Sequence, residues 1–147
     1  MISKLLTAWL LAAACVAIHA IGMTILLRGL RRANARETVH FWISTWLLVS
    51  VAGWILLLHL VEIAVWAFFY TWKQAMPDLT SALYFSAVTY TTTGYGDLVL
   101  PSEWRLVGGV EALIGILMCG WSAAFFIAVV NRMNEARPSA EQGDLSP

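Results

Sequence analysis

Apolar residues gather in three long runs, Leu5 to Leu27, Phe41 to Tyr70 and Leu106 to Val130, separated by short polar segments. A helix needs about 20 residues to cross a bilayer, so each run is long enough to span one. A fourth segment, Leu79 to Thr91, is too short to cross and leads into polar residues. Non-helical backbone at membrane depth is tolerated only where it is buried in protein or lines a water-filled cavity. The pattern predicts an all-α membrane protein with three spanning helices and one re-entrant helix.

The same pattern divides the chain into three parts. Residues 1–40 form a spanning helix and a basic loop, and residues 132–147 form a polar tail that we expect to be disordered. The central part, 41–131, contains helices at 41–70, 79–91 and 103–131 and a polar loop at 92–97. The alternative for the first run is a cleaved signal peptide, but the run is long for that.

Composition and charge narrow the class further. The chain has 147 residues, of which 60% are hydrophobic and 12% charged, more apolar than a soluble domain of this size can bury. The formal net charge is zero, so we expect no nucleic-acid partner. The loop after the first run carries Arg28, Arg31, Arg32 and Arg36 against Glu37, and short basic loops stay in the cytoplasm. Topology explains this cluster more simply than lipid binding does. We expect a multi-pass protein of the cell (inner) membrane with its N-terminus outside and its C-terminus cytoplasmic.

The segment TYTTTGYGDLVL, residues 89–100, differs from everything around it. Gly94 and Gly96 allow backbone angles that other residues resist. Successive carbonyl oxygens that face one water-filled axis replace the hydration shell of a permeating cation. A glycine-rich turn that binds nothing is the alternative, but such a turn needs neither a threonine run nor a helix before it.

The motif TTTGYGD, Thr91 to Asp97, resembles the T-T-V-G-Y-G-D of the potassium-channel pore family, and PDLTSALYFSAVTYT before it resembles the pore helix. The resemblance covers Val61 to Val130, so the first helix lies outside it. It implies a homotetramer in the lipid bilayer that passes K⁺ passively and selectively, with no cofactor, nucleic acid or small-molecule substrate. The alternatives are a weakly selective monovalent cation channel and a non-conducting accessory subunit. No catalytic triad, metal cluster or phosphate loop is visible, so we do not expect an enzyme.

The resemblance also assigns roles along the motif. The K⁺ ligands would be backbone carbonyls of Thr92, Thr93, Gly94 and Tyr95, with Gly96 lining the outer entrance of the filter and Asp97 at the outer mouth. Thr93 stands where the family usually has valine. Its hydroxyl should point toward the pore helix and bond a helix carbonyl, the Thr89 hydroxyl or Glu111, and selectivity could soften as a result.

Other polar residues qualify as support for the filter. Tyr84 keeps a phenol able to bond Asp97. Glu62 shares a helix face with His59, and we expect it to bond the re-entrant segment or another subunit. Glu111 either braces the filter from behind or lines the cavity.

The remaining expectations concern single residues on the helices. Gly115 is either a gating hinge or a packing residue, whereas Gly108 and Gly109 fit close packing best. Asp78 and Ser102 are the expected helix caps. We interpret His19, which is alone on the first span, as a packing or interfacial residue.

Overall fold

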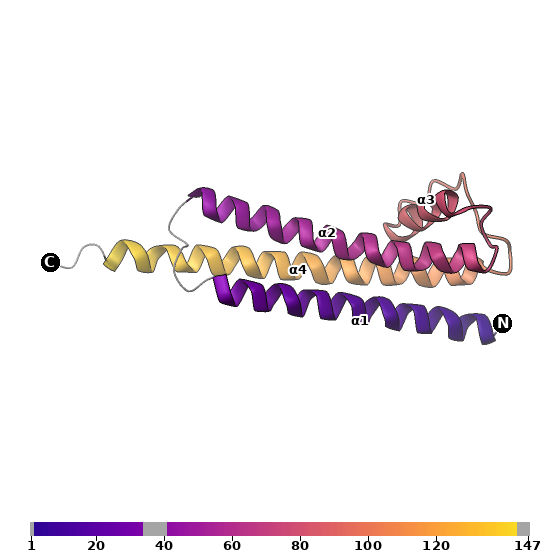
Figure 1. Cartoon of the computed structure of the whole chain (residues 1–147), viewed down its shortest axis with the longest axis horizontal. Helices are drawn as coiled ribbons and strands as arrows, with labels where there is room; N and C mark the ends of the chain where they lie inside the picture. The colour runs from indigo at the N-terminus through magenta and orange to yellow at the C-terminus, as the bar shows by residue number, and fades with distance from the viewer. Residues whose placement is uncertain (1, 34–40, 144–147) are drawn as a thin grey trace.

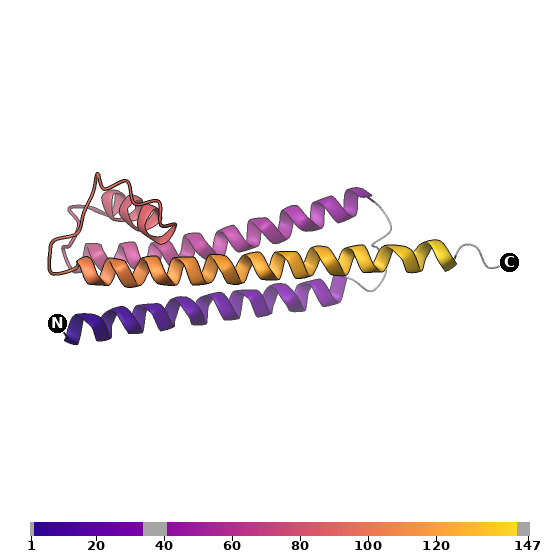
Figure 2. The same cartoon turned by 180° about the vertical axis from the view of Figure 1, so that it is seen from behind.

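The computed structural model describes residues 2–33 and 41–143, with side chains for 2–32 and 45–133. Within these residues the chain forms four α-helices: α1 (Ile2–Ala33), α2 (Phe41–Trp72), α3 (Leu79–Tyr90) and α4 (Arg105–Gly143). The three long helices run side by side, and the short α3 lies against one end of them (Figures 1 and 2). The N-terminus lies at the end that carries α3, and the C-terminus lies at the opposite end. The all-α architecture with one short, non-spanning helix confirms the expected fold class.

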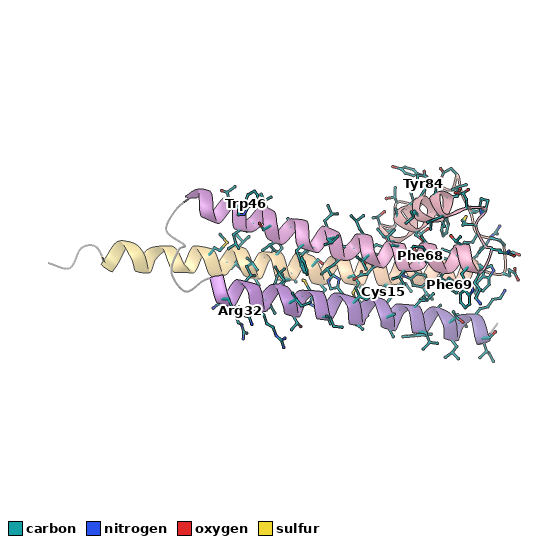
Figure 3. All side chains as sticks on the ribbon, in the orientation of Figure 1. Cys15, Arg32, Trp46, Phe68, Phe69 and Tyr84 are labelled. Atoms are coloured by element: carbon teal, nitrogen blue, oxygen red, sulfur yellow. The ribbon has the colours of Figure 1, made fainter. Side chains whose placement is uncertain are left out.

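The long helices are those of an integral membrane protein. In the described part of the chain three helices are long and apolar enough to cross a bilayer, within Ile2–Arg32, Thr45–Trp72 and Arg105–Met133. Large apolar side chains project from them along their length, and Trp46 and Phe68 point outward (Figure 3). Such an apolar surface is unfavourable in water and is matched by lipid or by other subunits.

Two helices extend beyond the apolar runs. α1 continues through Arg28 to Ala33, and α4 continues to Gly143, whereas we predicted a disordered tail from residue 132. The added residues include Arg, Glu, Gln and Ala, which are strong helix formers even without an apolar face. α4 also begins later than expected. Pro101 to Trp104 form a turn, with the Trp104 amide bonded to the Pro101 carbonyl at 2.8 Å, so Ser102 does not cap the helix.

α3 begins as the sequence predicts. Asp78 adopts an extended conformation, and its carboxylate accepts bonds from the Ser81 amide at 2.8 Å and the Ser81 hydroxyl at 2.9 Å. These two bonds hold the pKa of the Asp78 carboxyl below its usual value. The cap fixes the start of α3 and therefore the direction in which its other end points.

The best-buried side chains lie where α3 meets the long helices. Trp66, Tyr70, Tyr90 and Met118 are almost completely buried. The Tyr70 ring meets Phe85 of α3 edge-on, with the ring centres 5.5 Å apart. α3 is therefore packed against α2 and α4 through large aromatic contacts, which hold the loop that follows it.

Candidate ion-conduction site

The loop after α3 folds back onto the last turn of that helix. Its amides form the following bonds to helix carbonyls: Thr92 to Thr89 at 2.9 Å, Thr93 to Val88 at 2.9 Å and Gly94 to Val88 at 3.2 Å. Carbonyls in the last turn of a helix otherwise lack partners, so the loop satisfies them. In a trans peptide the carbonyl points opposite to the amide of the next residue. The carbonyls of residues 91–93 therefore point away from α3.

The backbone angle φ is positive at every second residue of this loop. It is 59° at Thr92, 58° at Gly94 and 77° at Gly96, and the residues between them do not share this sign. Alternation of this kind turns successive peptide groups so that like atoms face one side. For a β-branched residue such as Thr92 a positive φ is rare, and it costs about 1–3 kcal/mol. The sequence indicated the two glycines but gave no sign of the strain at Thr92.

The Thr93 side chain is exposed in the single chain, and its hydroxyl has a partner, but not one that we predicted. It shares a hydrogen bond of 2.9 Å with the Thr91 hydroxyl, which also donates to the Ala87 carbonyl at 2.7 Å. The expected partners were a pore-helix carbonyl, Thr89 or Glu111. Because Thr91 ends α3 in a helical conformation, its side chain lies beside the residue two positions on.

At the outer end of the loop, the Tyr84 hydroxyl donates to Asp97 Oδ2 at 2.7 Å. This bond holds the pKa of the Asp97 carboxyl below its usual value and raises the pKa of the Tyr84 phenol. The contact predicted between these residues is therefore present. It ties the start of the segment after the loop to the middle of α3.

The two buried acids bond different helices. The Tyr90 hydroxyl, at the end of α3, donates to Glu62 Oε2, which is the bond to the re-entrant segment that we expected for Glu62. Tyr70 of α2 donates to Glu111 Oε2 at 2.8 Å and joins α2 to α4. The Glu111 side chain is fully buried, and its Oε1 has no hydrogen-bond partner among the described residues. It braces the helices under α3 and does not face an open cavity within this chain.

The glycines of α4 differ in their surroundings. A Cβ added at Gly115 would stand 2.7 Å from the Tyr90 carbonyl carbon and closer still to the carbonyl oxygen. At Gly108 the nearest atom would be a Leu100 methyl at 3.1 Å, whereas nothing lies within 4 Å at Gly109. Close packing therefore accounts for Gly115 and Gly108 but, within this chain, not for Gly109. A hinge at Gly115 stays a prediction.

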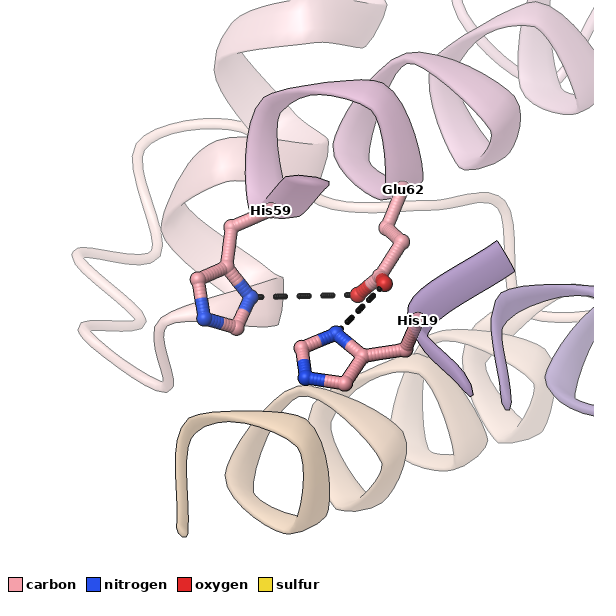
Figure 4. Close-up of side chains that lie close together, drawn as sticks. All are labelled: His19, His59 and Glu62. Carbon is pink, nitrogen blue, oxygen red and sulfur yellow. Dashed lines mark hydrogen bonds and ion pairs between the residues drawn. The ribbon is translucent and has the colours of Figure 1, made fainter. Parts of the chain in front are cut away.

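Nothing in the sequence indicated that His19 contacts another candidate site residue. It is fully buried, and its Nδ1 lies 2.9 Å from Glu62 Oε1 (Figure 4). Of the two sequence interpretations, the interfacial one is therefore wrong, while the packing one holds, since the ring lies against His59 and Trp121; neither anticipated the bond to Glu62. The partner is 43 positions away on another helix, and no local pattern connects the two.

Residues 44–132 match a protein family described as ion channel. The match starts earlier than the resemblance we recognised and covers α2, α3, the loop and most of α4, while α1 lies outside it. No curated protein and no solved structure matches the chain. The matched region is well over half of the chain, and it contains the capped short helix and the loop of alternating backbone. The chain belongs to this ion channel family, the two-helix pore domains that include potassium-channel pores.

Proposed function

We propose that the protein passes K⁺ selectively and passively across a membrane, with the carbonyls of Thr92, Thr93, Gly94 and Tyr95 as ligands and Gly96 lining the outer entrance. The observation that carries this proposal is the backbone at 92–96, in which φ alternates in sign and the first amides are tied back to α3. Carbonyl oxygens left free on the opposite side are the ligands that K⁺ filters use. The C-terminal end of α3 adds partial negative charge that favours a cation.

The pore of this proposal is a homotetramer. One chain supplies one filter strand, and a ring of carbonyls requires several strands around an axis. In the single chain Tyr95 is 72% exposed. A neighbouring subunit in the tetramer would cover this ring and the outer face of the loop.

The orientation of the proposal follows from the two ends of α1. Lys4 pairs with Glu103 at 2.8 Å, so the N-terminus and the filter share one end of the molecule. Arg28, Arg31 and Arg32 lie at the other end of α1, while Arg36 and Glu37 lie outside the described residues. Basic residues beside a span stay in the cytoplasm, which supports a filter that opens on the outer side of the cell membrane.

The test is ion flux from liposomes that contain the purified protein, under K⁺ and then Na⁺ gradients. Gly94→Ala strains a residue with a φ of 58° and should abolish K⁺ flux. Gly53→Ala is the control, since nothing lies within 4 Å of that position on α2, and its flux should equal that of the wild type. Loss of flux in both variants, or in neither, would contradict the assignment of residues 92–96 as the filter.

A second candidate is a weakly selective monovalent cation channel of the same fold. The bond between Thr93 and Thr91 favours it, because this hydroxyl pair replaces the apolar contact that valine would make. Equal K⁺ and Na⁺ flux in the same liposomes would support this candidate over the first.

A further inference from the structure

Five polar side chains from all four described helices meet inside the membrane-spanning part of the chain. We call this set the polar ring, and its members are His19 of α1, His59 and Glu62 of α2, Tyr90 of α3 and Ser122 of α4. Figure 4 shows the two imidazoles pointing at the carboxylate. His19, Glu62 and Ser122 are buried and only His59 keeps partial exposure, 14% of its side chain.

The contacts close into a circle. Glu62 Oε1 lies 2.9 Å from His19 Nδ1, and Glu62 Oε2 accepts a bond from the Tyr90 hydroxyl. The Tyr90 oxygen lies 3.0 Å from His59 Nδ1. Ser122 Oγ completes the circle, 3.1 Å from Nε2 of both imidazoles.

Counting hydrogens gives the protonation state of the ring. Among the described side chains the circle contains five hydrogen bonds, and each needs one hydrogen. Tyr90 and Ser122 supply one each, and two neutral imidazoles supply one each. With Glu62 ionised, one bond therefore has no hydrogen, and two acceptors face each other across it. One additional proton completes the circle.

The additional proton also settles the charge. Without it, the ring carries one negative charge at membrane depth, where an unpaired charge is costly. With it, on either imidazole or on Glu62, the net charge is zero and every bond is made. We propose that the polar ring is a proton-binding site, and that its bound proton braces the end of α3 from which the filter begins.

The donor set of two imidazoles and one carboxylate is also one that holds zinc. In the ring, however, every imidazole nitrogen already has a hydrogen-bond partner, and His59 Nδ1 lies nearer the Tyr90 oxygen, at 3.0 Å, than Glu62 Oε2, at 3.8 Å. A metal ion would have to break these bonds, whereas a proton completes them. Metal binding is therefore an outcome that the experiment must exclude.

The other titratable groups around the ring leave it without a basic partner. Cys15 of α1 and Cys119 of α4 interact electrostatically with Glu62, and Cys15 also interacts with Glu111 of α4. α3 contributes Tyr90 and α2 contributes His59. Among the described residues no lysine or arginine pairs with the ring, so no fixed positive charge replaces the proton.

This site gives α1 a role, although α1 lies outside the region matched by the family. Tyr90 is the last residue of α3, and Thr91 and Thr92 follow it directly into the loop. His19 reaches Tyr90 through Glu62, so α1 acts on the filter from behind. His19 is a positioning residue in this arrangement, and its effect on conduction rests on the proposed function.

The first experiment reads the protons directly and needs no conduction. The chain has three histidines, so nitrogen-15 labelling of His40→Gln protein leaves signals from His19 and His59 alone. At about pH 5 we expect a proton on His59 Nδ1. If His19 Nδ1 also carries a proton, then only one of the two imidazoles should carry a proton on its Nε2 atom. If His19 Nδ1 is bare, the infrared spectrum should show a protonated Glu62 carboxyl. A bare His59 Nδ1, a bare His19 Nδ1 with an ionised Glu62, or zinc bound at one ion per chain would overturn the site.

The second experiment couples the site to conduction. K⁺ current is measured from about pH 5 to about pH 8, the interval in which imidazoles change charge. The current should fall with rising pH over the interval in which the ring loses its proton, and it should not change with pH where the ring keeps its proton.

In His19→Gln the amide itself donates to Glu62, so the current should lose its dependence on this proton. Cys119→Ala, which removes a thiol beside the ring, is the control and should keep the wild-type profile. Current that changes without proton loss, or a His19→Gln profile like the wild type, would overturn the coupling.

Discussion

The contact between Gly115 and Tyr90 makes a quantitative prediction about how α3 is held. In Gly115→Ala the new methyl group meets the Tyr90 carbonyl, and its carbon would stand 2.7 Å from the carbonyl carbon. The atoms it meets are backbone, so they cannot rotate away as a side chain would. Forcing an extra carbon into a packed site costs about 1–3 kcal/mol.

Gly109→Ala is the matched variant on the same helix. Nothing lies within 4 Å of this position, so the change should give only the gain in helix propensity, about 1 kcal/mol. The same gain applies at Gly115, so the difference in free energy of unfolding between the two variants is the cost of the clash. A difference of about 1–3 kcal/mol per subunit corresponds to a factor of about 5 to 150 in the folding equilibrium.

The assay is thermal unfolding of the two purified variants in the same detergent, followed by circular dichroism, together with K⁺ flux from liposomes. Gly115→Ala should unfold at a lower temperature than Gly109→Ala and conduct less, because α3 and the loop are displaced. Equal stability of the two variants would refute the close approach of α4 to the end of α3.

Three further predictions concern the filter and its orientation. Thr93→Val removes the 2.9 Å bond to Thr91 and should change the K⁺ to Na⁺ permeability ratio in bi-ionic reversal potentials while the tetramer stays intact; an unchanged ratio would deny this hydroxyl a role. Tyr84 lowers the pKa of Asp97, so their bond persists until the pH falls through that lowered value. In Tyr84→Phe the Asp97 pKa returns toward about 3.9 and acid on the outer side should reduce the current at a higher pH than in the wild type; coincident curves would contradict this. In a Cys119→Ser background, an impermeant thiol reagent should label Ser3→Cys and Ser102→Cys from outside and Ala35→Cys only from inside; external labelling at Ala35 would reverse the orientation.

The sequence predicts most of the fold because each helix carries its own signal. The apolar runs define the three spans, and Asp78 marks the start of α3 through a local side-chain bond. The ends of α1 and α4 could not be placed by hydropathy, because their final turns are polar residues with high helix propensity.

The candidate site divides in the same way. The motif from Thr91 to Asp97 is contiguous, so its residues are readable from the sequence, and so is the pairing of Tyr84 with Asp97. The polar ring could not be predicted from the sequence, because His19, Tyr90 and Ser122 come from three helices whose faces meet only after packing. The choice of Thr91 as the partner of Thr93 likewise depends on how α3 ends.

The most direct test of selective conduction is the reversal potential of the purified protein in a planar bilayer. If the filter passes K⁺ and rejects Na⁺, the reversal potential should move by about 59 mV for each tenfold change in the K⁺ gradient. Replacing Na⁺ on either side should leave it unchanged. A reversal potential that follows Na⁺ as closely as K⁺ would contradict the account.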